Sequence, residues 1–187
     1  YLLGSIPFGL ILTYAAAGGD IRAVRSGNIG ATNVLRTGRK GLAAATLLLD
    51  AAKGAAAVLL AALIWPDQPQ LPGTAAIGAF LGHLYPVWLR FTGGKGVATL
   101  IGIVAALHWP VALIVLATWA LLFALTRYSS VGGMAAGLAA PVVAALLGRF
   151  DLAILFAGFA LLILWTHRAN IGRLLKGDEP KVGRKAG

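Results

Sequence analysis

The sequence contains no cysteine, which excludes disulfide scaffolds, thiol nucleophiles and thiolate metal sites. Charge is also scarce, because Asp, Glu, Lys and Arg make up 12% of the 187 residues, against about 25% in ordinary soluble domains. Hydrophobic residues make up 59% of the chain. A chain this short could not bury so much apolar surface in water, since small domains keep a large share of their area exposed. The composition therefore predicts a membrane protein.

Seven apolar segments follow one another, separated by short polar or Pro- and Gly-marked breaks. They cover about residues 1–18, 42–65, 73–89, 97–108, 110–126, 131–148 and 152–167. Backbone groups in hydrocarbon must satisfy one another, and the segments lack the alternation of a membrane β-strand. We therefore predict an all-α polytopic membrane protein with seven transmembrane helices in a single domain over 1–187. Segment 97–108 is the weakest, because it is short for the ~30 Å hydrocarbon core.

Positive charge is distributed unevenly between these helices. With the first helix running inward, the inner segments are 19–41, 90–96, 127–130 and 168–187. Their Lys and Arg residues are Arg22, Arg25, Arg36, Arg39, Lys40, Arg90, Lys95, Arg127, Arg168, Arg173, Lys176, Lys181, Arg184 and Lys185. Of the remaining two, Arg149 falls in an outer segment and Lys53 within a helix. Positive residues mark cytoplasmic loops, so we predict an outer N-terminus and a cytoplasmic C-terminus.

The chain begins inside an apolar run without a basic stretch before it. We expect this run to be a transmembrane helix and not a signal peptide. The net charge of +10 follows from the basic inner segments, so no nucleic-acid partner is expected. Most of these cations, such as Arg22 and Arg39, need no role beyond membrane topology.

Three inner segments combine positive charge with glycine, amide and hydroxyl groups. They read SGNIGATN over 26–33, FTGGKG over 91–96 and HRANIGR over 167–173. Topology requires only Lys and Arg. Glycine lets backbone N–H groups converge on an anion, while hydroxyls and amides add donors. The combination on one membrane face indicates a phosphate-binding site.

Nucleotide and metal sites are poorly supported by the same residues. The segment GGKGVAT lacks the G-x-x-x-x-G-K-[ST] spacing of a nucleotide-binding loop, and no strand precedes it. His83, His108 and His167 lie on different segments, and no H-E-x-x-H pair is present. We therefore expect neither a metal nor a cofactor.

Two charges lie inside an apolar segment, in LLLDAAKG. Asp50 and Lys53 are three residues apart and share a helix face, where each lone charge costs about 2.5–3.5 kcal/mol. They fit either a buried ion pair that locks two helices or a contact with an anionic ligand. His83, in GHLYPVW, fits either a substrate contact or an interior histidine at a helix bend caused by Pro86.

Four longer motifs carry these groups: SGNIGATNVLR (26–36), LLDAAKG (48–54), GHLYPVWLRFTGGKGVAT (82–99) and HRANIGRLLKGDEPK (167–181). In sequence, order and loop position they resemble the bacterial integral-membrane acyl-phosphate:glycerol-3-phosphate acyltransferase family. The resemblance implies seven helices and an active site on the cytoplasmic face of the bacterial inner membrane. It also implies acyl transfer from acyl phosphate to the primary hydroxyl of glycerol 3-phosphate. The products would be 1-acyl-glycerol 3-phosphate and phosphate, in the first acylation step of phospholipid biosynthesis.

The resemblance also implies which residues form the site. Catalytic roles would fall to Ser26, Lys95, His167 and Asn170. Substrate and phosphate binding would fall to Asn28, Gly30, Thr32, Asn33, Arg36, Gly93, Gly94 and Gly96, with Ser129 or Ser130 as a further donor. Asp50, Lys53 and His83 would support the site. Either His167 or an oxygen of the substrate phosphate would accept the hydroxyl proton.

Other common glycerolipid acyltransferases use an H-x-x-x-x-D motif, which is absent here. The residues five positions after the three histidines are Trp88, Leu113 and Gly172. The absence suits an acyl phosphate, because this mixed anhydride has a good leaving group and needs neither a covalent intermediate nor a strong base.

Two other classes of function remain open from the residues alone. A transporter for an anionic metabolite would use a basic vestibule, but its polar groups should also lie near the midplane and on the far side. A structural subunit that binds anionic lipid would explain the basic tail but not the loops rich in Gly, Asn and Thr.

Overall fold

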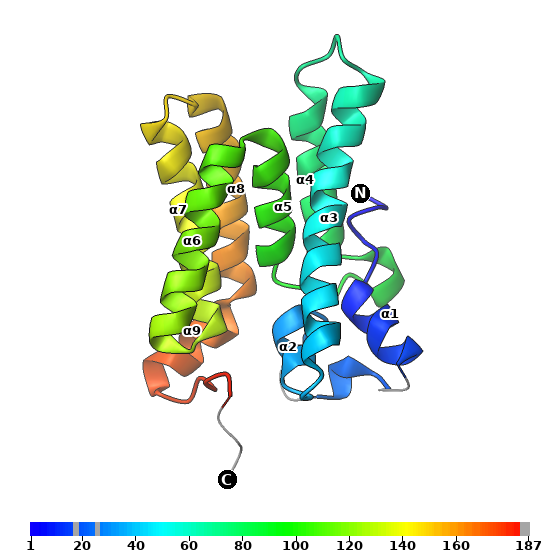
Figure 1. Cartoon of the computed structure of the whole chain (residues 1–187), viewed down its shortest axis with the longest axis vertical. Coiled ribbons are helices and arrows are strands. Elements are labelled where there is room, and N and C mark those ends of the chain that lie inside the picture. Colours follow the sequence, from blue (N-terminus) through cyan, green and yellow to red (C-terminus); the bar gives the residue numbers. More distant parts are fainter. Residues whose placement is uncertain (17–18, 25–26, 184–187) are drawn as a thin grey trace. The chain divides into compact units, whose positions relative to one another are not determined.

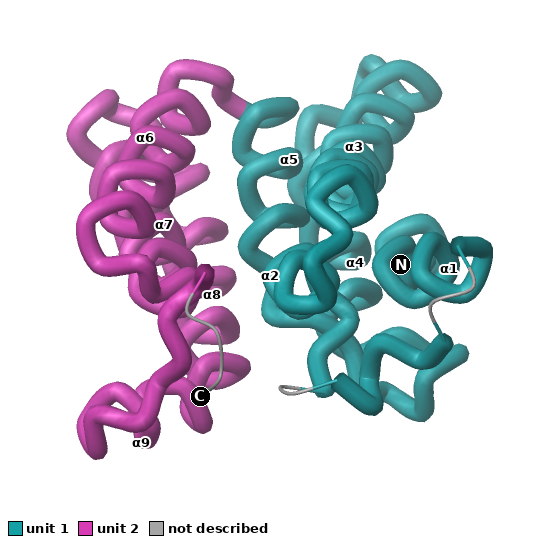
Figure 2. The backbone as a smooth tube through the Cα atoms, turned by 60° about the horizontal axis from the view of Figure 1, so that its bottom comes forward, with its two compact units in different colours: residues 1–107 teal, residues 108–187 magenta. Residues whose placement is uncertain are grey.

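The computed structural model describes residues 1–16, 19–24 and 27–183, and every regular element in these ranges is helical (Figure 1). The chain divides into two compact units, Tyr1–Leu107 and His108–Gly187, which Figure 2 distinguishes by colour. We call them unit 1 and unit 2 and describe each by itself. The single domain expected over 1–187 stays a prediction.

Each of the seven apolar segments contains an α-helix, which confirms the all-α prediction. The helices are α1 (Phe8–Ala15), α3 (Lys40–Ile64), α4 (Leu71–Leu84), α5 (Val97–Leu107), α6 (Trp109–Thr126), α7 (Ser129–Leu146) and α8 (Phe150–Thr166). Four shorter elements lie in segments expected to be loops or helix ends: η1 (Ile21–Ala23), α2 (Ala31–Leu35), η2 (Val87–Leu89) and α9 (Arg168–Lys176).

Within the described ranges, three helices are long and apolar enough to cross a membrane. They are α3 with 25 residues and α6 and α7 with 18 each. Helices α8 and α9 pass the same test only as one broken span, bent by 56°. Helix α5 has 11 residues, about 16 Å at 1.5 Å per residue, or half of the hydrocarbon core. Seven crossings and the orientation of the chain therefore stay predictions.

Two helices are shorter than predicted, and a proline accounts for each difference. The first segment was expected to be helical from residue 1, but α1 begins only after Pro7. Proline disfavours helical geometry in the residue before it and donates no hydrogen bond. Likewise, α4 was expected to bend at Pro86 and continue to residue 89, but it ends at Leu84. Pro86 thus terminates the helix instead of kinking it.

In unit 1, α3 packs against α4 and α5 through small residues. A Cβ added at Gly54 would lie 2.7 Å from the Thr99 carbonyl oxygen, and one at Gly102 would overlap the Ala51 backbone. The loops at one end of α3 share an apolar cluster of buried Leu10, Ile21, Val34 and Ala43. Leu89 of η2 packs against this cluster, so the first loop and the loop after α4 lie side by side.

In unit 2, α7 packs against both α6 and α8. Close contact again depends on small residues, since a Cβ at Gly132 would lie 2.9 Å from the Trp119 carbonyl oxygen. Interhelical contacts of this kind are typical of helices in lipid, where close backbone approach replaces the hydrophobic drive. The α6–α7 turn and the chain after α9 meet at one end of unit 2, where Val182 N–H donates to the Arg127 carbonyl at 2.9 Å.

Candidate functional site

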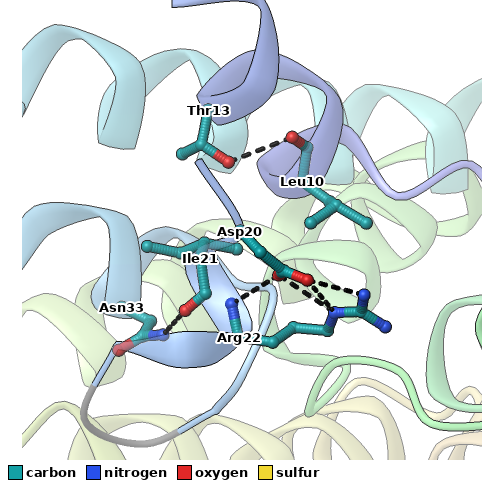
Figure 3. A network of polar contacts seen from close by, with 6 residues as sticks. All are labelled: Leu10, Thr13, Asp20, Ile21, Arg22 and Asn33. Atoms are coloured by element: carbon teal, nitrogen blue, oxygen red, sulfur yellow. Dashed lines mark hydrogen bonds and ion pairs between the residues drawn. The ribbon is translucent and has the colours of Figure 1, made fainter. Parts of the chain in front are cut away.

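Asn33 organises the first loop of unit 1. Its side chain is buried, and Nδ2 donates to the carbonyls of Ile21 at 2.9 Å, Val24 at 3.0 Å and Asn28 at 2.8 Å. Figure 3 shows Asn33 beside η1 and reaching the Ile21 carbonyl. These contacts give Asn33 a loop-shaping role, and the phosphate contact that the motif implied stays a prediction.

The neighbouring residues of the first loop have different surroundings. Asn28 Oδ1 accepts from the Gly30 N–H at 2.8 Å, a tight turn that leads into α2. Thr32 and Arg36 are half-buried and four residues apart, which places them on one face of the short helix. Ser26, predicted to be catalytic, lies outside the described residues.

Arg22 has a structural partner in Asp20. The two side chains form an ion pair of 2.7 Å, and both are partly exposed (Figure 3). Hydrogen bonds from Arg22 lower the pKa of Asp20. An exposed pair of this kind contributes little to stability, because water and salt screen it. The contact agrees with the interpretation that Arg22 has no catalytic role.

The glycine-rich loop of unit 1 is held against the end of α4. Gly93 N–H donates to the Leu84 carbonyl and Gly94 N–H to the His83 carbonyl, each at 3.0 Å. These bonds satisfy two of the carbonyls that a helix C-terminus leaves without an internal partner. A Cβ at Gly94 would overlap the His83 imidazole. Close contact with α4 therefore explains why both positions are glycine.

Lys95 follows directly in this loop and is half-buried. Gly96 comes next with φ +88°, a left-handed conformation that strongly favours glycine. The chain thus bends at Gly96, directly after Lys95 and immediately before α5 begins at Val97. With two glycine N–H groups bonded to α4, Lys95 is the charged group of this loop suited to an anionic ligand.

Asp50 and Lys53 form a buried ion pair of 2.7 Å on α3, and each side chain is almost fully buried. Lys53 Nζ also donates at 2.7 Å to the carbonyl of Ile6, which directly precedes Pro7 and the start of α1. It lies 5.8 Å from the centre of the Phe8 ring. His83 Nδ1 is 3.7 Å from Asp50 Oδ1. The structure therefore brings together the three residues predicted to support the site.

In unit 2, His167 lies at the bend between α8 and α9 and is buried. Its Nδ1 is 2.8 Å from the Ile163 carbonyl oxygen. A carbonyl can only accept, so Nδ1 carries the proton and, in the neutral ring, Nε2 has the lone pair. This tautomer suits a proton acceptor at Nε2.

A buried carboxylate joins the remaining predicted residues of unit 2. Glu179 Oε1 accepts from Ser130 Oγ at 2.7 Å and from Asn170 Nδ2 at 2.6 Å. Glu179 Oε2 accepts from Arg173 Nε at 2.7 Å. Burial opposes the charged form, but these three hydrogen bonds outweigh it and lower the pKa of Glu179 from its ordinary value of 4.5. Ser129, the alternative to Ser130, is half-buried at the first turn of α7.

The chain after Glu179 is fastened to the α6–α7 turn. Arg127 donates from Nε and Nη2 to the Val182 carbonyl at 3.2 and 3.0 Å, and its own carbonyl accepts from Val182 N–H. Lys181 Nζ lies 5.3 Å from the centre of the Tyr128 ring. We call residues 178–183 the C-terminal strap. It holds Glu179 in place between α7 and α9.

The sequence analysis did not name Glu179, which the structure places in contact with the predicted residues Ser130 and Asn170. The signal that could have found it is composition, because Glu179 is the only glutamate in the chain and occurs in a basic tail. In the part of the chain that the structure describes, no three His, Asp or Glu side chains gather as a metal site would need.

Comparison with known proteins decides the family. Residues 1–177 match the sequence model of the family described as glycerol-3-phosphate acyltransferase. The chain belongs to the glycerol-3-phosphate acyltransferase family. A relative with that name from Mesorhizobium japonicum is 55% identical over 99% of this chain and 93% of the relative. A second, from Rhodopseudomonas palustris, has the same identity and coverage.

Solved structures of this acyltransferase family have the same fold. PlsY (YgiH), an integral membrane glycerol 3-phosphate acyltransferase crystallised in its glycerol 3-phosphate form, matches with a TM-score of 0.91 and 37% identity. The match covers 98% of this chain and 92% of PlsY. The lysophosphatidic acid form matches with a TM-score of 0.88 and 35% identity. The acyltransferase identity and the apolar helices agree with the sequence prediction of a membrane enzyme.

Proposed function

We propose that this acyltransferase uses acyl phosphate as donor and acylates the primary hydroxyl of glycerol 3-phosphate. The hydroxyl oxygen attacks the acyl carbonyl, a new ester bond forms, and the bond from the carbonyl carbon to the phosphate oxygen breaks. Phosphate leaves with the bonding electron pair, and the products are 1-acyl-glycerol 3-phosphate and phosphate. The donor is an activated anhydride, so the protein has to bind, orient and neutralise charge more than supply a nucleophile.

The observation that carries this proposal is the pair of polar clusters at loop ends of an otherwise apolar protein. In unit 1 the cluster contains Lys95, beside the glycines, together with Thr32 and Arg36 from the neighbouring loop. Lys and Arg suit substrates that bear phosphate. In unit 2 the cluster contains His167 and Asn170. We assign the first set to phosphate binding and the second to the reacting hydroxyl and carbonyl.

His167 is the proposed proton acceptor, through Nε2. Its support is the Nδ1 contact with the Ile163 carbonyl, which fixes the tautomer and leaves Nε2 basic in the neutral ring. Membership in an integral membrane family and the basic loops support a site on the cytoplasmic face of the bacterial inner membrane.

The test is a reconstitution with purified protein in lipid, acyl phosphate and glycerol 3-phosphate, without thioester. We expect 1-acyl-glycerol 3-phosphate and phosphate in equal amounts, and a parallel reaction with an acyl thioester tests the donor. Product from the thioester alone would overturn the donor assignment. Lys95→Ala should lower the rate about a hundredfold, the size of one lost donor to developing charge. Lys176→Ala, an exposed lysine of α9, is the matched control.

A further inference from the structure

Three side chains of unit 1 form a buried polar chain that ends at the glycine-rich loop. Lys53 contacts Asp50 at 2.7 Å, and Asp50 lies 3.7 Å from His83 Nδ1. The imidazole in turn lies directly against Gly94. All three side chains are at most 4% exposed. The chain therefore links α3, through α4, to the residue next to Lys95.

Backbone contacts reinforce this link. His83 and Leu84 supply the two carbonyls that hold Gly94 and Gly93, each at 3.0 Å. His83 thus contacts the loop twice, through its carbonyl and through the Nε2 side of its ring. A change in the ring therefore changes the support under Gly94, one residue from Lys95.

The charges of Asp50 and Lys53 lie buried within an apolar helix, where charged side chains are rare. An uncompensated charge inside a membrane segment is costly, so such residues are usually paired and functional. The Asp50–Lys53 pair needs no third partner for neutrality. Its carboxylate nevertheless lies 3.7 Å from His83 Nδ1, beyond hydrogen-bond distance, where its negative charge acts on the imidazole electrostatically. Helix locking alone does not account for a histidine between the ion pair and the loop.

We propose that His83 is a positioning residue for glycerol 3-phosphate binding, oriented by the Asp50–Lys53 pair and acting through Gly94 on Lys95. The inference rests on the proposed function for its substrate. His83 itself does not touch the substrate. Its ring fixes the distance between the glycine-rich loop and the end of α4, and therefore the position of the Lys95 ammonium group.

The first test separates binding from turnover. His83→Ala should raise the KM for glycerol 3-phosphate about tenfold or more and change kcat less, and His83→Asn should restore part of the affinity. His108→Gln, at the start of α6, is the matched histidine control and should leave KM unchanged. Folding is checked by melting temperature. A folded His83→Ala protein with a KM within about twofold of the unsubstituted protein would overturn the proposal.

The second test uses the steric contact between Gly94 and the His83 imidazole. Gly94→Ala should raise KM because its methyl group meets the imidazole. His83→Ala removes that ring, so Gly94→Ala should have a much smaller effect in the His83→Ala background. Fully additive effects would show that the ring does not act through Gly94, and would overturn the proposal.

The third test addresses the ion pair. Asp50→Asn with Lys53→Met removes both charges together and avoids leaving one buried alone. If the pair orients His83, KM rises in this double variant, whereas a pure helix lock changes only the melting temperature. All variants are also assayed for direct binding of glycerol 3-phosphate by calorimetry. Failure of the acyl-phosphate reaction with intact binding would then refute the proposed donor alone, while absence of binding in the unsubstituted protein would refute the positioning role.

Discussion

Glu179 should stabilise the end of unit 2 more than any other single side chain of the C-terminal strap. Its carboxylate accepts hydrogen bonds from Ser130, Asn170 and Arg173 and is 3% exposed. A hydrogen bond to a charged group is worth about 1.5–3 kcal/mol. The Arg173 side chain is 39% exposed, so its contribution is only about 0.2–1 kcal/mol. Two bonds of the first kind and one of the second predict that Glu179→Ala costs about 3–7 kcal/mol.

Glu179→Gln provides a graded comparison. Glutamine keeps one oxygen to accept from Ser130 or Asn170 but turns an N–H group toward another donor, at a cost of about 1–3 kcal/mol. Asp178→Asn is the matched control, because it removes an adjacent, exposed carboxylate. The assay is thermal melting in detergent together with limited proteolysis of the strap. Melting and cleavage of Glu179→Ala equal to those of Asp178→Asn would refute the reasoning.

The pH dependence of stability tests the same carboxylate. Its folded pKa lies below the ordinary value of 4.5, so the folded state favours the ionised form. The stabilisation is complete above about pH 4.5 and is lost as the pH falls through the lowered folded pKa. The melting temperature of the unsubstituted protein should fall in that acidic range, toward that of Glu179→Gln. Glu179→Gln itself should show a smaller decrease over the same pH interval.

Three further substitutions have defined outcomes. Asn33→Ala leaves three loop carbonyls without their amide donor. It should lower stability by about 1–3 kcal/mol and weaken glycerol 3-phosphate binding, as measured by melting and calorimetry. Arg127→Asn tolerates the left-handed backbone at φ +62° but loses both side-chain bonds to the Val182 carbonyl, so the strap should be cleaved faster by protease. Gly54→Ala overpacks α3 against α5 and should cost about 1–3 kcal/mol in melting experiments. Gly158→Ala, with open space around it, should not.

The helices were predictable because long apolar runs in lipid have few structural solutions. The errors occur where one residue overrides the run. Pro7 delays α1 and Pro86 ends α4, whereas hydrophobicity alone continues through both. Helix α9 was missed because its apolar residues alternate with polar ones and form no continuous apolar run.

For the candidate site, the structure adds the contacts of individual donors, while the membership of the site stays a prediction. Motifs named Asn33, Gly93 and Gly94 as candidates, but they do not say where a donor points. The structure directs all three toward other parts of the protein, through bonds to the first loop and to the end of α4. Glu179 was not predicted because its partner Ser130 is 49 residues away in the sequence, and no local motif indicates that contact.

Buried polar contacts, and not apolar packing alone, shape the loops in each unit. Asn33 and His83 in unit 1 and Glu179 in unit 2 are all buried and all contact backbone or side chains that carry the proposed site. In the proposal Lys95 is half-buried and contacts the substrate, whereas the other three residues are buried. Replacing Lys95 should therefore lower the rate far more than the melting temperature, whereas replacing the three buried residues should lower both. Measuring both quantities for every variant separates the two classes, and a Lys95 variant that melts with the buried set would place that lysine among the structural residues.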